Sequence, residues 1–264
     1  MIRSFILATV AVACIVLAVS RLQQASSIPR SEARGGKGPV VVELFTSEGC
    51  SSCPPADALL RRLEESKSLD GTDVIVIGWH VDYWDHQGWK DRFSSPDFTQ
   101  RQHDYADAFA SDQVYTPQMV VDGRTEFIGS DEAKARTAIH QASLEGKAAI
   151  SLSVKQLAPG KIELQSDVRD LPAVTSAAQV VILLVESNLE TQVRAGENQG
   201  VTMKHAAVVR LIKPAGSVQP GQAHHQVSQL TLEKGWKLQD LRAVLLLHDA
   251  RDRRILGAAS IPLQ

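Results

Sequence analysis

The pattern of apolar and polar residues changes near Gly146. Before this point, continuous apolar runs indicate buried strands, and apolar residues that recur among charges indicate amphipathic helices. Strands are predicted at 40–45, 74–79, 117–121 and 125–128, and helices at 57–69, 96–110 and about 130–146. Ser94 or Ser95 is the predicted N-cap of the second helix, and Asp122-Gly123 predicts a hairpin turn. The order β-α-β-α-β-β-α predicts a small α/β sheet.

The second part of the chain has the pattern of an all-β structure. Short apolar runs rich in β-branched residues occur at 150–154, 162–165, 180–185, 206–212 and 244–247. Turn signals such as Pro159-Gly160 and Pro220-Gly221 separate them. Strands at this spacing predict an antiparallel β-sandwich.

The N-terminal segment has the pattern of an export signal. Residues 5–19 carry no charge and follow Arg3. This run is shorter than the ~20 residues that a membrane-spanning helix needs, and it suits the core of a signal peptide. Because the matches to a cleavage site are loose, an uncleaved inner-membrane anchor stays open. We predict a signal peptide or anchor over 1–22, a linker over 23–38, and a periplasmic or secreted location.

Composition and charge narrow the classes of partner that the protein is expected to bind. The chain has 264 residues, of which 22% are charged, and a formal net charge of −2. This balance is that of a globular protein and gives no basic surface for nucleic acid, so no nucleic-acid partner is expected. Contact with a membrane is expected only through the N-terminal segment.

The candidate chemistry lies in Cys50-Ser51-Ser52-Cys53-Pro54, between a buried strand and a helix. A helix N-terminus favours the thiolate, which is the nucleophile in disulfide exchange. Glu48 is an acid that would work against the thiolate. A CxxC pair also occurs as a structural disulfide or in metal sites, and these two alternatives stay open. Zinc would need two further ligands, and the sequence has no second CxxC.

A second element resembles the thioredoxin-like superfamily. It consists of Thr116-Pro117-Gln118 at a strand start, the Asp-Gly turn, and Ile128-Gly-Ser-Asp131. The residues around the proline resemble those of glutaredoxins. The resemblance implies that the bond before Pro117 is cis, that Pro117 lies against the CxxC, and that Thr116 presents its backbone to a substrate. We therefore assign Thr116 and Pro117 to substrate binding.

A longer resemblance covers residues 39–264. It rests on an aromatic-rich insertion over 79–109, on the segments 48–55 and 114–118, and on Ala195–Gly200 and Val208–Arg210 in the second part. These segments resemble a family of secreted bacterial thioredoxin-like proteins of unknown function. The implied fold is an α/β thioredoxin-like domain over 39–147, followed by an antiparallel β-sandwich-like domain over 148–264.

His80 and Asp82 are candidates to support the reaction. Their spacing in an extended chain places them on one face, near the end of the strand beside the one that precedes Cys50. They are predicted to line a cleft rim with Trp79 and Trp84 and to stabilise or protonate a thiolate. Two alternatives stay open: a structural hydrogen-bonded network, or, with Asp85 and His86, a divalent-ion site.

The remaining histidines receive no catalytic role. His205, His224, His225 and His248 are scattered through the second part, and the adjacent pair is expected in a solvated loop beside Pro220-Gly221.

Together these features predict an envelope thiol-disulfide oxidoreductase. Cys50 would attack and Cys53 would resolve the mixed disulfide. The partner would be a protein or a small-molecule thiol or disulfide, and no cofactor is expected. Two other function classes stay open. One is a copper-type metal-binding protein that uses the two cysteines and His80, and the other is a non-catalytic binding module with a permanent disulfide.

Overall fold

The computed structural model describes residues 30–33, 36–172 and 177–264. The predicted signal peptide or anchor, residues 1–22, lies outside this part of the chain. Within the described part, no helix is both long enough and apolar enough to span a membrane.

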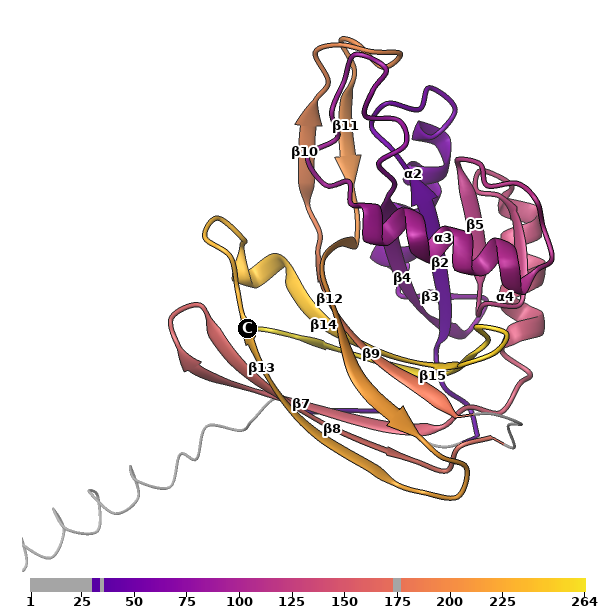
Figure 1. The fold of residues 1–264 in the computed structure, drawn as a ribbon, viewed down its shortest axis with the longest axis vertical. Helices are drawn as coiled ribbons and strands as arrows, with labels where there is room; N and C mark the ends of the chain where they lie inside the picture. Colours follow the sequence, from indigo (N-terminus) through magenta and orange to yellow (C-terminus); the bar gives the residue numbers. More distant parts are fainter. Residues whose placement is uncertain (1–29, 34–35, 173–176) are drawn as a thin grey trace, which may run out of the picture.

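The largest sheet runs through both parts of the chain (Figure 1). Its strand order is β15-β14-β9-β12-β4-β2-β5-β6, and the short β3 pairs with β4. The strands are β2 (Val40–Thr46), β3 (Ser68–Leu69), β4 (Thr72–His80), β5 (Gln118–Val121), β6 (Thr125–Ile128), β9 (Ala178–Glu186), β12 (Val208–Val218), β14 (Leu241–Asp249) and β15 (Ile255–Pro262). The parallel pair β2–β4 is flanked by antiparallel β5 on one side and by parallel β12 on the other.

Two smaller sheets complete the β structure of the described residues. One has the order β1-β7-β8-β13 and the other is the hairpin β10–β11. Their strands are β1 (Arg30–Ala33), β7 (Ala149–Ala158), β8 (Lys161–Arg169), β13 (His224–Thr231), β10 (Leu189–Gln192) and β11 (Thr202–His205). A 3-10 turn, η1 (Leu238–Asp240), precedes β14. Strand β1 lies inside the segment predicted as a linker, and the histidine pair expected in a loop begins β13.

Three helices cover the first part of the large sheet: α2 (Pro54–Ser66), α3 (Pro96–Ala108) and α4 (Glu132–Ala142). The apolar faces of α2 and α4 share one core with alternate residues of β2 and β4, whereas α3 packs on the other face with Phe45 and Trp79. The N-cap of α3 is Ser95, as predicted, and its side chain accepts from the backbone of Asp97 at 3.2 Å. Helix α2 begins at Pro54, earlier than predicted, because proline suits the first helical turn.

The four-stranded sheet packs on the second part of the large sheet. Alternate side chains of β9 and β14 share a core with those of β7 and β8. The intervening side chains of β9 and β14 belong to the core that α3 covers. Both faces of these two strands are therefore buried, which explains why their sequences are continuous apolar runs.

Strand β12 joins the two parts of the chain. It pairs in parallel with β4 through Val208 and Gly78, and the Gly78 amide donates to the Ala207 carbonyl at 2.8 Å. On its other side β12 pairs with β9. The sheet thus continues past residue 147, and the division into two domains at that residue stays a prediction.

Candidate functional site

The cysteine pair lies between β2 and α2 and is closed by a disulfide bond. Cys53 is the N-cap of α2, and its amide donates to the Cys50 carbonyl at 3.2 Å in a tight turn. The two Cα atoms are 5.4 Å apart, and both side chains are 0% exposed. The hydroxyl of Ser52 lies 3.4 Å from Cys50 Sγ. The predicted strand-to-helix position of the pair is confirmed.

The Thr116–Pro117 peptide bond is cis, as the resemblance implies. Pro117 precedes β5 and lies beside the first turn of α2. This follows from Gly129, where an added Cβ would be 3.1 Å from Ala56 Cβ and 3.3 Å from Pro117 Cβ. Because Ala56 follows Cys53 in the same turn, the proline and the disulfide belong to the same end of the sheet.

Trp84 connects the loop before the disulfide to the residue before the cis proline. Its indole Nε1 donates to Thr116 Oγ1 at 2.8 Å. A Cβ added at Gly49 would lie 3.3 Å from Trp84 Cβ, so the two chain segments are in close contact. Among the aromatic residues predicted at the rim, Trp84 therefore lies beside the site, whereas Trp79 is fully buried and donates to Glu43.

His80 and Asp82 have different hydrogen-bond partners. His80 is buried, and its Nδ1 lies 2.6 Å from Asp91 Oδ2. Asp82 instead accepts from Thr99 Oγ1 of α3 at 2.5 Å. The physical reason is that β4 ends at His80. The alternation that would keep both side chains on one face does not extend to Asp82.

Five buried ionisable side chains gather behind the disulfide. They are Glu48 before the cysteines, Asp57 in α2, His80 at the end of β4, Asp91 between β4 and α3, and His205 at the end of β11. The two imidazole rings are 5.0 Å apart, centroid to centroid, and approach edge to face. Asp57 Oδ1 accepts from Thr46 at 2.8 Å, and Asp91 also accepts from the Glu48 amide at 2.9 Å. The space between Asp57, His80 and His205 is too small for a water molecule.

Several polar atoms of this cluster lack an aligned hydrogen bond. They are Glu48 Oε1, Asp57 Oδ2 and both ring nitrogens of His205. His205 Nε2 is 3.1 Å from Glu48 Oε1, which is the distance of an ion pair without the orientation of a hydrogen bond. Buried polar atoms without partners are costly and rare in native proteins. Their concentration near one disulfide makes this cluster a candidate functional site.

The charges of the cluster depend on where its protons lie. Burial raises the pKa of Asp57, against the opposing effect of His205 and His80. Burial alone would lower the pKa of His80, but its ion pair with Asp91 raises it above the usual value. The same ion pair outweighs burial at Asp91 and lowers its pKa. Asp57 is therefore a carboxyl group whose protonated form burial favours.

The second part of the chain supplies residues that the sequence did not single out. The loop between β10 and β11 brings Glu197 and Asn198 onto the CxxC, and β11 ends with His205. The only signal for them was the resemblance of residues 195–200 to a family segment. Glu48, expected to oppose the thiolate, lies 3.1 Å from His205 and accepts from Trp89 at 2.8 Å.

The described residues contain no ready metal-binding site. Their His, Cys, Asp and Glu side chains form no group of three or more that could hold an ion. Asp85 accepts from the Asp91 amide and from Ser94, and His86 is exposed. The two sulfurs are bonded to each other in this state.

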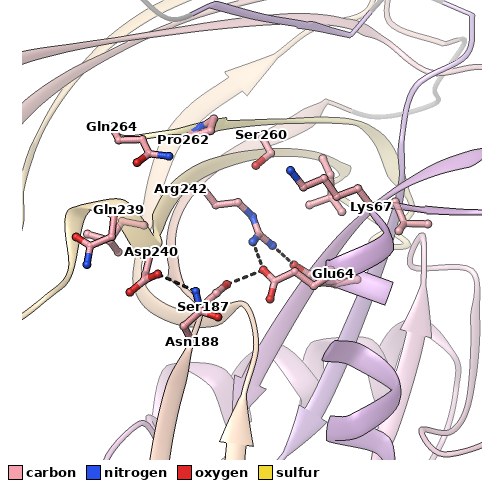
Figure 2. Close-up of a pocket in the computed structure, with 14 residues that line it drawn as sticks. Glu64, Lys67, Ser187, Asn188, Gln239, Asp240, Arg242, Ser260, Pro262 and Gln264 are labelled. Carbon is pink, nitrogen blue, oxygen red and sulfur yellow. Dashed lines mark hydrogen bonds and ion pairs between the residues drawn. The ribbon is translucent and has the colours of Figure 1, made fainter. Parts of the chain in front are cut away.

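A cavity of about 470 Å³ lies at the other end of α2 (Figure 2). Arg242 of β14 forms an ion pair there with Glu64 of α2, and it also donates to the Val76 carbonyl at 2.7 Å. Ser187 donates to Glu64 at 2.6 Å. Figure 2 shows these groups pointing toward one another across the cavity wall. They join α2 to the second part of the chain, and the cysteine pair lies at the opposite end of the helix.

Fold and site together define a class of protein. It is a mixed α/β protein whose large sheet carries a disulfide-bonded CxxC pair at the junction of a parallel strand and a helix. The second part of the same chain completes the surroundings of this pair.

The chain belongs to the DUF1223 family, a family of unknown function whose profile matches residues 41–248. A crystal structure of a protein from Agrobacterium tumefaciens is 27% identical, with a TM-score of 0.66 over 86% of this chain and 96% of that one. A domain of the outer membrane lipoprotein Omp28 from Porphyromonas gingivalis is 12% identical, with a TM-score of 0.29 over 45% of this chain and 88% of that one. No match was found among curated proteins.

Proposed function

We propose that the protein is a thiol-disulfide oxidoreductase of the bacterial envelope that acts through Cys50 and Cys53. The observation that carries the proposal is the disulfide between β2 and the N-terminus of α2, with a cluster of buried proton-binding groups behind it. The helix N-terminus favours a thiolate, and the cluster offers groups that exchange a proton. The cis Thr116–Pro117 bond beside α2 supports a thioredoxin-like arrangement of residues 39–147.

The two cysteines have distinct roles in this proposal. In the reduced protein, the Cys50 thiolate attacks one sulfur of a substrate disulfide, and the other substrate sulfur leaves as a thiolate. Cys53 then attacks Cys50 Sγ, which releases the second substrate thiolate and closes the Cys50–Cys53 bond. The substrate gains two electrons and the pair loses two, and the reverse sequence oxidises a dithiol. The Ser52 hydroxyl, 3.4 Å from Cys50 Sγ, supports Cys50 as the attacking residue because it can donate to a thiolate.

Asp57 is the proposed proton acceptor for Cys53. It lies one helical turn further along α2, on the same buried face, and its amide donates to the Cys53 carbonyl at 3.1 Å. Cys53 must lose a proton before it attacks and regain one after it leaves. Because burial raises the pKa of Asp57, its carboxyl can hold the proton in the intervening state.

The reduction potential of the pair tests the proposal. Full-length protein is equilibrated in glutathione and dithiothreitol redox buffers, and free thiols are trapped with a maleimide and counted by mass. An exchange-active pair should titrate reversibly with a potential between about −270 and −120 mV. The Cys53→Ser variant should accumulate mixed disulfides on Cys50, whereas Cys50→Ser should not. The opposite pattern would reverse the two roles.

A second candidate is a binding module with a permanent disulfide. The observation in its favour is that both cysteine side chains are 0% exposed. The same titration decides between the two, because a potential below about −300 mV is typical of structural disulfides. Metal content measured on the reduced sample tests the copper-type alternative.

A further inference from the structure

The loop that connects β10 and β11 lies over the cysteine pair. Figure 1 shows the β10–β11 hairpin beside the N-terminal end of α2, apart from the two larger sheets. The Val193 amide donates to the Val201 carbonyl and the Gly200 amide to the Val193 carbonyl, both at 2.9 Å. These bonds close the hairpin tip, residues 193–201, into a compact turn.

The hairpin tip is bound to the backbone on both sides of Cys50. The Asn198 amide group donates to the Cys50 carbonyl and to the Glu48 carbonyl, each at 2.9 Å. Glu197 Oε2 accepts from the Ser51 amide at 3.1 Å and from the Ser51 hydroxyl at 2.7 Å. Asn198 is 5% exposed, so its two bonds are shielded from water.

The tip also packs against the aromatic insertion. A Cβ added at Gly196, where φ is +75°, would lie 3.1 Å from Trp89 Cβ. Trp89 in turn donates to Glu48, which belongs to the buried cluster. The tip is therefore docked on two segments at once, and the disulfide lies beneath it with no exposed area.

The hydrogen bonds of the tip resemble those of a peptide. Asn198 offers an amide N–H to a backbone carbonyl, and Glu197 offers a carboxylate oxygen to a backbone N–H. One extended peptide strand presents the same two kinds of group, a donor and an acceptor, at each residue. A small thiol has no main-chain donor and acceptor of this kind. It therefore forms no hydrogen bonds that would offset the loss of those made by the tip.

We propose that Glu197 and Asn198 are specificity-determining residues that restrict exchange at Cys50 to polypeptide partners. The inference rests on the proposed function. A polypeptide thiol or disulfide displaces the tip because its main chain takes over the bonds to Cys50 and Ser51. A cleft of about 180 Å³ beside the pair, between α2 and β11, gives room for a neighbouring side chain of the partner. Its walls include Pro54, Val201 and Met203.

The test compares a small probe and a peptide probe on the same thiol. In full-length Cys53→Ser protein, Cys50 reacts with thionitrobenzoate-capped 2-mercaptoethanol or with an extended ten-residue peptide whose single cysteine carries the same cap. The Cys50 thiolate bonds to the probe sulfur and thionitrobenzoate leaves as a coloured thiolate, so each rate is read directly. With the tip intact, the peptide should react faster than the small probe.

Asn198→Leu is the first variant, because it keeps the approximate shape, adds no charge beside Cys50 and loses both donors. It should raise the small-probe rate about tenfold, because the hydrogen bonds to the Cys50 and Glu48 carbonyls are lost, and it should change the peptide rate less. Glu197→Ala is the second variant and is exposed, so it tests the idea if the first does not fold. Glu197→Gln, which keeps an acceptor, should restore most of the selectivity. Gln199→Ala, an exposed neighbour in the same tip, should change neither rate.

Two results would overturn the inference. One is an unchanged small-probe rate in the tip variants, and the other is an equal change for both probes, which would leave the tip without a role in selection. These results leave the proposed function standing if Cys50 reacts. If Cys50 reacts with neither probe in any variant, the proposed function fails and this inference fails with it.

Discussion

Replacement of Glu43 by Gln tests a buried charge that accepts hydrogen bonds from three side chains. Glu43 lies in β2 with 0% exposure and accepts from Arg101 Nε at 2.7 Å, from Arg101 Nη2 at 3.0 Å and from Trp79 at 2.8 Å. It also accepts from the Tyr105 hydroxyl. The Arg101 guanidinium lies 4.9 Å from the Trp79 ring centre. This network fixes α3 and the aromatic insertion onto the sheet.

The expected loss follows from the burial of the pair. Arg101 is 4% exposed, so Glu43→Gln leaves a buried cation without its counter-charge, at a cost of about 3–5 kcal/mol in the free energy of unfolding. Arg101→Met leaves the carboxylate unpaired and should cost a similar amount. The double variant removes both charges and keeps an amide oxygen for Trp79 and Tyr105. It should lie within about 1–2 kcal/mol of wild type, and thus be more stable than either single variant.

Urea unfolding followed by tryptophan fluorescence and far-ultraviolet circular dichroism measures these values. Equal slopes against urea for all four proteins would show that the transition itself is unchanged. If the double variant is as unstable as the sum of the two single losses, the two charges are not coupled and the reasoning is refuted.

Two further predictions concern other buried charges. The pKa of His80 is raised above 6.5 by Asp91, so its stabilisation is complete below that pH and is lost as pH rises through the folded-state pKa. The free energy of unfolding of wild type relative to His80→Gln should therefore fall above pH 6.5, by at most about 1.4 kcal/mol per pH unit, and a pH-independent difference would contradict this. Lys147→Met leaves the buried carboxylate of Asp122 unpaired and should cost about 3–5 kcal/mol in urea unfolding. The exposed ion pair of Arg124 is the matched control, since Arg124→Ala should cost less than about 1 kcal/mol.

Local patterns predicted most elements of the first part of the chain. Apolar runs located β2 and β4, proline and serine located the start of α3, and Asp122-Gly123 located the turn between β5 and β6. These signals succeed because each depends on neighbouring residues alone. The cis bond at Pro117 came from resemblance, because no local pattern distinguishes a cis proline from a trans one.

The surroundings of the disulfide could not be predicted in the same way. Asn198 bonds to Cys50 across 148 positions of sequence, and Glu197 bonds to Ser51 across 146. Single polar residues at such separations carry no periodicity. His205 was one of several scattered histidines until the fold placed it beside Glu48. His80 and Asp82, expected on one face, bond to different partners, because β4 ends at His80.

The chain order of the site has a consequence for biogenesis. A ribosome makes Cys50 and Cys53 long before residue 198, and contacts between residues so far apart in sequence form slowly. For part of its life, each new chain therefore carries both cysteines without the hairpin that later buries them. During that interval the hairpin does not shield the pair, so the first disulfide can form without displacement of residues 193–201.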